Sequence, residues 1–124
     1  MSTKLALMSE IVAAQFAQNR EQSAGLELLQ ASTWSAFMER CREAQVAVVE
    51  LERMGEEPLR GYADMQACGV KLVIITHLFA KKSTLQALTN AGARLMKSPL
   101  QLAQLRSQMM SIIVKDLLSG GSHV

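Results

Sequence analysis

The segment from Val70 to Ala80, VKLVIITHLFA, constrains the fold of this chain more than any other. It is apolar on almost every side and is interrupted by Lys71 and His77. A membrane-spanning helix needs about 20 consecutive apolar residues, so this run is too short to cross a bilayer. A helix that is apolar all round is normally buried by other helices. We therefore favour a buried core helix here, although the β-branched residues also permit a buried strand.

The composition favours helix along the whole chain. The 124 residues are 49% hydrophobic but only 4% aromatic, with eight methionines and two prolines. Leu, Ala, Met, Gln, Glu, Lys and Arg are good helix formers, and they dominate this sequence. We therefore predict an all-α fold: one helical domain over residues 1–124, built as an amphipathic bundle of about four helices. The last residues, about 119–124, are expected to be disordered.

Apolar spacing predicts where these helices lie. A first helix is expected over residues 3–18, and residues 59–97 read as one long helix or two abutting ones. A second helix, capped by Ser32 or Thr33, is predicted from a heptad spacing carried by Trp34, Phe37, Cys41, Ala44, Val48 and Leu51. Such spacing is typical of a coiled-coil seam. Gly55 and Pro58 are expected to end that helix.

A last helix is predicted from a well-formed start signal. Ser98 is the expected N-cap, Pro99 occupies the first helical position, and Gln101 can complete a capping box. The apolar seam that follows consists of Leu102, Leu105, Met109 and Ile112, widened by Ile113 and Leu117.

Charge and cysteine usage limit the possible partners and the compartment. The net charge is +2, from 13 basic and 11 acidic residues, which is too balanced to indicate nucleic-acid binding. Cys41 and Cys68 form no CxxC pair, and the residues after Lys4 do not resemble a signal peptide. We therefore expect a cytoplasmic protein with reduced thiols and no transmembrane segment.

A search for catalytic groupings gives none. His77 is followed by Lys81 at the fourth position and by no glycine, unlike the His-x-x-Lys-Gly pattern of phosphotransfer bundles, so it is read as a core or interfacial histidine. His77 and His123 make no metal pair, no Glu-x-x-His motif is present, and no Gly-rich phosphate loop exists. We therefore expect no enzymatic activity, no metal and no cofactor.

The C-terminal third resembles the phasins, which are helical proteins that coat polyhydroxyalkanoate granules in bacteria. The resemblance runs over residues 88–110 and is carried by Ser98, Pro99, Gln101, Leu102, Leu105, Gln108 and Met109. It implies a non-enzymatic protein that covers an oily polyester surface with amphipathic helices. Each apolar side chain buried on such a surface contributes on the order of 1.5–3 kcal/mol.

Our first hypothesis is therefore a phasin-like protein at the granule surface, homo-oligomeric through its apolar seams. The interaction surface is predicted to consist of Trp34, Phe37, Val48, Leu51, Leu102, Leu105, Met109, Ile112 and Ile113. The alternative is a small helical adaptor or chaperone that holds a helix of a partner protein against residues 70–80.

Overall fold

The computed structural model describes residues 3–110 and shows an α/β fold with one five-stranded parallel sheet. The strands are β1 (Thr3–Met8), β2 (Leu26–Gln30), β3 (Val46–Glu50), β4 (Leu72–His77) and β5 (Arg94–Lys97). The helices are α1 (Glu10–Gln18), α2 (Trp34–Cys41), α3 (Pro58–Ala67) and α4 (Lys82–Ala91). Two short 3-10 helices, η1 (Arg20–Ser23) and η2 (Leu51–Arg53), follow α1 and β3, and residues 102–110 are also helical.

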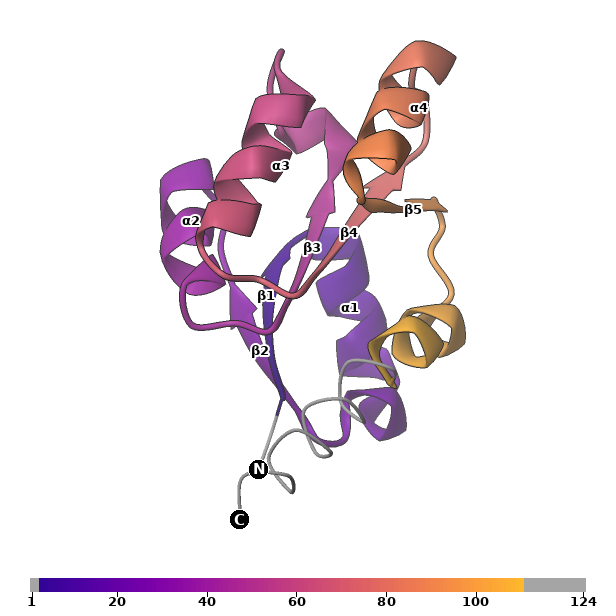
Figure 1. The fold of residues 1–124 in the computed structure, drawn as a ribbon. Helices are drawn as coiled ribbons and strands as arrows, with labels where there is room; N and C mark the ends of the chain where they lie inside the picture. The colour runs from indigo at the N-terminus through magenta and orange to yellow at the C-terminus, as the bar shows by residue number, and fades with distance from the viewer. Residues whose placement is uncertain (1–2, 111–124) are drawn as a thin grey trace.

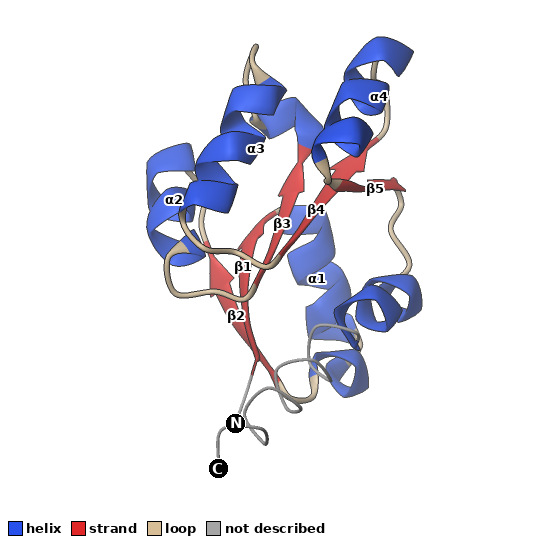
Figure 2. Cartoon of the chain, in the orientation of Figure 1, coloured by secondary structure: helices blue, strands red, loops and turns tan. Residues whose placement is uncertain are grey.

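The sheet lies between two layers of helices, as Figures 1 and 2 show. The strand order is β2-β1-β3-β4-β5, and all four pairings are parallel. Helices α2, α3 and α4 cover one face, whereas α1 and the helix at residues 102–110 lie on the other. Because every crossover returns the chain to the same end of the sheet, all strands point their carboxyl ends to one edge, which we call the carboxyl edge.

Alternate residues of the central strands supply two separate cores. In β3, Ala47 and Val49 face α2, α3 and α4, whereas Val46 and Val48 face α1. The same alternation holds in β4, with Ile75 in the first core. The central strands are therefore buried on both faces, as is usual for a parallel sheet.

Local signals set the ends of several helices. Ser9 caps α1, and Thr33 caps α2 by accepting a hydrogen bond from the backbone N–H of Ala36 at 3.2 Å. Pro58 occupies the first turn of α3. Gly92 ends α4 with a positive φ of 110°, a conformation that glycine adopts without a steric penalty.

The predicted all-α bundle with coiled-coil seams is wrong. Residues 3–18 contain β1 and α1, the heptad spacing at residues 34–51 runs through α2 and β3, and residues 59–97 contain most of α3 and all of β4, α4 and β5. Strands buried on both faces are apolar at every position, so they lack the alternation that distinguishes a strand from a buried helix. The alternative interpretation of residues 70–80, a buried strand, is confirmed by β4.

The last predicted helix begins later than its sequence signal indicated. The backbone N–H of Ser98 donates to the carbonyl of His77 at 2.8 Å, and helical residues start at 102. Ser98 and Pro99 therefore belong to the connection that follows β5, and the predicted Ser98 cap is wrong. The predicted tail at about 119–124 lies outside the described residues. None of the described helices has the length and apolar character that a bilayer crossing requires.

Candidate functional site

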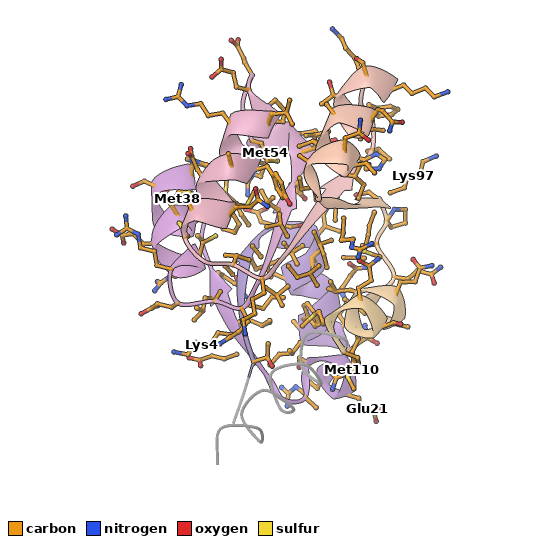
Figure 3. The ribbon with its side chains drawn as sticks, viewed as in Figure 1. Lys4, Glu21, Met38, Met54, Lys97 and Met110 are labelled. Carbon is orange, nitrogen blue, oxygen red and sulfur yellow. The ribbon has the colours of Figure 1, made fainter. Side chains whose placement is uncertain are left out.

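The carboxyl edge beside β1 and β3 is the place where this topology favours a site. In open parallel α/β sheets, ligands bind outside the carboxyl ends of the strands, where the strand order reverses. Here the chain leaves β1 toward β2 on one side and later returns to β3 on the other. Ser9 follows β1, while Glu50, His77 and Lys97 end β3, β4 and β5. Lys97 lies at the β5 side of the molecule in Figure 3.

Ser9 and Glu50 are joined across the point where the strand order reverses. The Ser9 hydroxyl donates to Glu50 Oε2 at 2.9 Å, and its oxygen accepts from the backbone N–H of Val12 at 3.2 Å. Ser9 is only 4% exposed, and Glu50 is half-buried. The carboxylate at the end of β3 is therefore already engaged by a side chain from the end of β1.

A second carboxylate ties the next loop to the same edge. Glu52, in η2, accepts a 3.1 Å hydrogen bond from the backbone N–H of Leu78. This bond fixes the start of the β4–α4 loop, but the loop's apolar side chains remain outside the core: Leu78 is 50% exposed and Phe79 is 85% exposed. The carboxyl edge therefore combines engaged carboxylates with an anchored, solvent-exposed apolar loop.

A small cavity of about 280 Å³ opens beside β1 and β2. Its lining residues are Leu7, Ser9, Glu10, Gln30, Ala31, Ser32 and Arg53. A site for Mg²⁺ or Ca²⁺ concentrates carboxylate oxygens. The lining of this cavity instead contains one carboxylate, from Glu10, and one guanidinium, from Arg53. Within residues 3–110 there is no group of three or more His, Cys, Asp or Glu side chains placed to hold a metal ion.

The two cysteines lie away from this edge, between α2 and the end of α3. Cys41 is fully buried, and burial together with the neighbouring Cys68 thiol raises the pKa of Cys41 to about 12. Cys68 is half-buried, with its sulfur 3.8 Å from the carbonyl oxygen of Met38. Both thiols are unpaired, and the deprotonated nucleophilic form of Cys41 is strongly disfavoured at neutral pH.

Several solved structures with a similar arrangement are described as receiver domains. The signal receiver domain of a Luxo repressor protein from Vibrio parahaemolyticus superposes with a TM-score of 0.74 at 11% identity, covering 100% of this chain and 99% of that chain. The chain has the fold of a response-regulator receiver domain. A CheY-like receiver domain protein from Methanospirillum hungatei gives a TM-score of 0.72 at 13% identity, covering 96% and 99% of the two chains. One from Clostridium thermocellum gives 0.70 at 18%, covering 95% and 98%.

At these identities the likeness concerns the fold. No protein-family model matches the sequence, and no curated protein matches it. The receiver fold nevertheless overturns the resemblance to phasins, because residues 88–110, which carried it, form the end of α4, β5 and a helix packed on a sheet. The phasin-like coat and the helical adaptor are both wrong. The coat needs apolar helix faces free to cover a granule, but the helices of residues 3–110 pack their apolar faces on the sheet. The adaptor needs a helix at residues 70–80, but this segment contains β4, a buried strand inside the sheet.

Most residues of the predicted interaction surface lie inside the molecule. The buried ones are Phe37, Val48, Leu51, Leu102, Leu105 and Met109. They fall on opposite faces of the sheet, so the fold does not bring them together. Trp34 is half-buried, with its ring 5.6 Å from that of Phe37, and Ile112 and Ile113 lie outside the described residues.

Sequence reasoning missed Ser9, Glu50 and Phe79. Ser9 falls within the first predicted helix, over residues 3–18, and Glu50 within the second, over residues 34–51, so neither is recognised as a residue at the end of a strand. Once the strands are known, both occupy the carboxyl ends where sites form. Phe79 was read as part of a buried run that in fact ends at His77.

Proposed function

We propose that this chain is a receiver-like signalling domain that acts by binding another protein through the β4–α4 loop at its carboxyl edge and that has no enzymatic activity of its own. The fold supports a signalling role, since the solved structures named above are signal receiver and response-regulator receiver domains. We place the domain in the cytoplasm, where unpaired cysteines such as Cys41 and Cys68 stay reduced.

One observation carries the proposal: the β4–α4 loop is anchored through its backbone while Phe79 remains 85% exposed. An isolated exposed apolar residue needs no explanation, but here Leu78 is also half exposed and directly adjoins Phe79. Contiguous exposed apolar surface typically marks an interaction site. A loop whose backbone is already fixed also loses little conformational freedom when it binds.

The chemistry at the same edge supports a role without covalent catalysis. Phosphoryl transfer depends on metal ions and positioned charges that stabilise the moving phosphoryl group. At this edge Oε2 of Glu50 already accepts a hydrogen bond from the Ser9 hydroxyl, and the lining of the adjacent cavity contains one carboxylate, from Glu10, and one guanidinium, from Arg53. We therefore expect the domain to transmit a signal through association.

The proposed absence of enzymatic activity is tested by asking whether the protein takes up a phosphoryl group from a small donor. Purified protein is incubated with acetyl phosphate and Mg²⁺, and its intact mass is then measured beside that of a Glu50→Gln variant. We expect neither protein to gain mass. A gain of one phosphoryl group in the wild type that is absent from the variant would overturn the non-enzymatic proposal.

Protein binding is tested with a photo-reactive amino acid placed at position 79 in living cells. The control position is Ile11, an equally apolar residue that is 56% exposed at the start of α1. We expect a discrete cross-linked protein from position 79 and none from position 11. Equal cross-linking from both positions, or none from position 79, would contradict a binding surface at this loop.

A further inference from the structure

Three large apolar side chains are exposed around the starts of α3 and α4. Phe79 is 85% exposed, Leu78 is 50% exposed and Leu59 is 47% exposed. Leu59 belongs to the first turn of α3, and the other two residues lie just before α4. Figure 1 shows that both helices start at the carboxyl edge of the sheet. The protruding loop at Leu78 and Phe79 therefore stands near the exposed beginning of α3.

A groove lies between the first turns of the same two helices. Its volume is about 520 Å³, within the range of pockets that enclose small ligands. Its lining residues are Glu56, Glu57, Pro58, Leu59, Arg60, Ser83, Thr84 and Ala87. Carbon atoms of Pro58, Leu59 and Ala87 give it an apolar part, which suits an aromatic ring.

The protruding loop and the groove carry opposite charges. Lys81 and Lys82 directly follow the loop, and both are exposed. Glu56 and Glu57 line the groove and are exposed as well. Glu57 forms a 3.6 Å ion pair with Arg60, but both side chains are more than 70% exposed, 72% and 78% respectively. Such an exposed pair contributes little, so a new partner for Glu57 displaces it at low cost.

We propose that the partner of this surface is a second copy of the chain, in a two-fold symmetric dimer. Phe79 of each copy inserts into the α3–α4 groove of the other, and Lys81 and Lys82 face Glu56 and Glu57 across the interface. This inference rests on the proposal that the carboxyl edge binds protein, and it names that protein.

Complementarity within a single chain favours a second copy over an unrelated partner. An apolar protrusion with positive charges and an apolar groove with negative charges both belong to this chain and lie next to each other. A two-fold axis between two such patches satisfies both contacts at once and closes the assembly. An interface built from one loop and two helix starts is small, so the dimer is expected to be weak and dependent on concentration and salt.

The test is sedimentation equilibrium of the full chain over a range of concentrations and at two salt concentrations. We expect a reversible monomer–dimer equilibrium that weakens with salt. Phe79→Ser is expected to raise the dimer Kd at least about tenfold, because a central aromatic anchor is lost. Ile11→Ser removes a similarly exposed apolar side chain at the start of α1, which covers the opposite face of the sheet from α3 and α4. This variant is expected to leave the Kd unchanged.

Charge reversal separates this symmetric dimer from other associations. A Lys81→Glu/Lys82→Glu variant places negative charge on both loop and groove, and a Glu56→Lys/Glu57→Lys variant places positive charge on both. Each variant alone is expected to be monomeric, whereas an equimolar mixture of the two forms a heterodimer because both contacts are then complementary. Far-UV circular dichroism verifies that each variant is folded.

Each result has a distinct meaning. A wild-type protein that stays monomeric, a dimer that ignores Phe79→Ser, or variants that do not pair when mixed would each overturn the symmetric dimer. A monomer whose position 79 still cross-links to a different protein would overturn the dimer and leave the proposed function standing. Phosphoryl uptake at Glu50 would contradict the proposed function without affecting the dimer.

Discussion

The hydroxyl of Ser9 donates a 2.9 Å hydrogen bond to the carboxylate of Glu50, 41 residues later in the chain. The same oxygen accepts from the backbone N–H of Val12 and so caps α1. One nearly buried side chain therefore both starts a helix and links the ends of β1 and β3 at the point where the strand order reverses. The Ser9–Glu50 hydrogen bond therefore joins the carboxyl ends of two neighbouring strands at the edge of the sheet where ligands of this kind of fold bind.

Replacing Ser9 by alanine removes both interactions. A helix cap contributes about 0.5–2 kcal/mol and a hydrogen bond to a charged group about 1.5–3 kcal/mol. We therefore expect Ser9→Ala to lower the free energy of unfolding by about 2–5 kcal/mol, measured by urea denaturation. Ser35→Ala, at an exposed serine of α2, is the matched control and is expected to change it by less than about 0.5 kcal/mol. Equal effects would show that the link does not stabilise the fold.

Cys41 is expected to make the fold sensitive to alkaline pH. Its ordinary pKa of 9.0 is raised to about 12 in the folded protein, first by burial and then by Cys68. Above about pH 9 the unfolded thiol loses its proton while the folded thiol keeps it, so the unfolded state binds fewer protons. The contribution of the protonated Cys41 thiol to the free energy of unfolding is therefore complete below about pH 9. It is lost as the pH rises toward about 12, the pKa of this thiol in the folded protein.

The measurement is the free energy of unfolding at pH values from about 8 to about 10.5, for the wild type and for Cys41→Ala. We expect the wild type to lose stability with pH more steeply than the variant. Burial also raises the pKa of Tyr62, which adds a decline that both proteins share. Parallel curves for the two proteins would assign no part of the alkaline loss to Cys41.

Local signals were predictable from the sequence even where the elements around them were not. Thr33 was one of two expected caps, and it caps α2. Gly55 and Pro58 were expected to end a helix over residues 34–51, which the structure replaces with α2 and β3; Gly55 instead has a positive φ of 80° in the turn before α3, and Pro58 starts that helix. The cap was predictable, and so was a break in the chain at Gly55 and Pro58, because caps and breakers depend on residues within a few positions of one another.

The sheet was not predictable in the same way. The apolar residues of β3 and β4 are buried on both faces, so their pattern is a continuous run that a buried helix also gives. In residues 34–51, the heptad spacing is a coincidence, because these residues form α2, a short connection and β3. The Ser9–Glu50 contact depends on the pairing of β1 with β3, which is a long-range contact that spacing along the chain does not show.

A side chain at Gly92 is expected to destabilise the fold. Its φ is 110°, and a Cβ there would lie 3.1 Å from the hydroxyl of Tyr62. Gly69 also has a positive φ, 90°, but nothing lies within 4 Å of its would-be Cβ, so it controls for backbone strain alone. We expect Gly92→Ala to lower the free energy of unfolding by about 1–3 kcal/mol more than Gly69→Ala does. In a Tyr62→Phe background, which lacks the hydroxyl, this difference shrinks; a constant difference would contradict the contact.

Leu105 distinguishes a core role for the helix at residues 102–110 from a role at the surface. It is fully buried against the α1 side of the sheet, whereas Met110 on the same helix is 44% exposed. Truncation of a buried leucine costs about 2–5 kcal/mol, because it leaves a cavity. We therefore expect Leu105→Ala to lower the urea midpoint strongly and Met110→Ala to leave it almost unchanged. A small effect of Leu105→Ala would mean that this helix contributes little to the core, and its apolar face would then be accessible to another molecule.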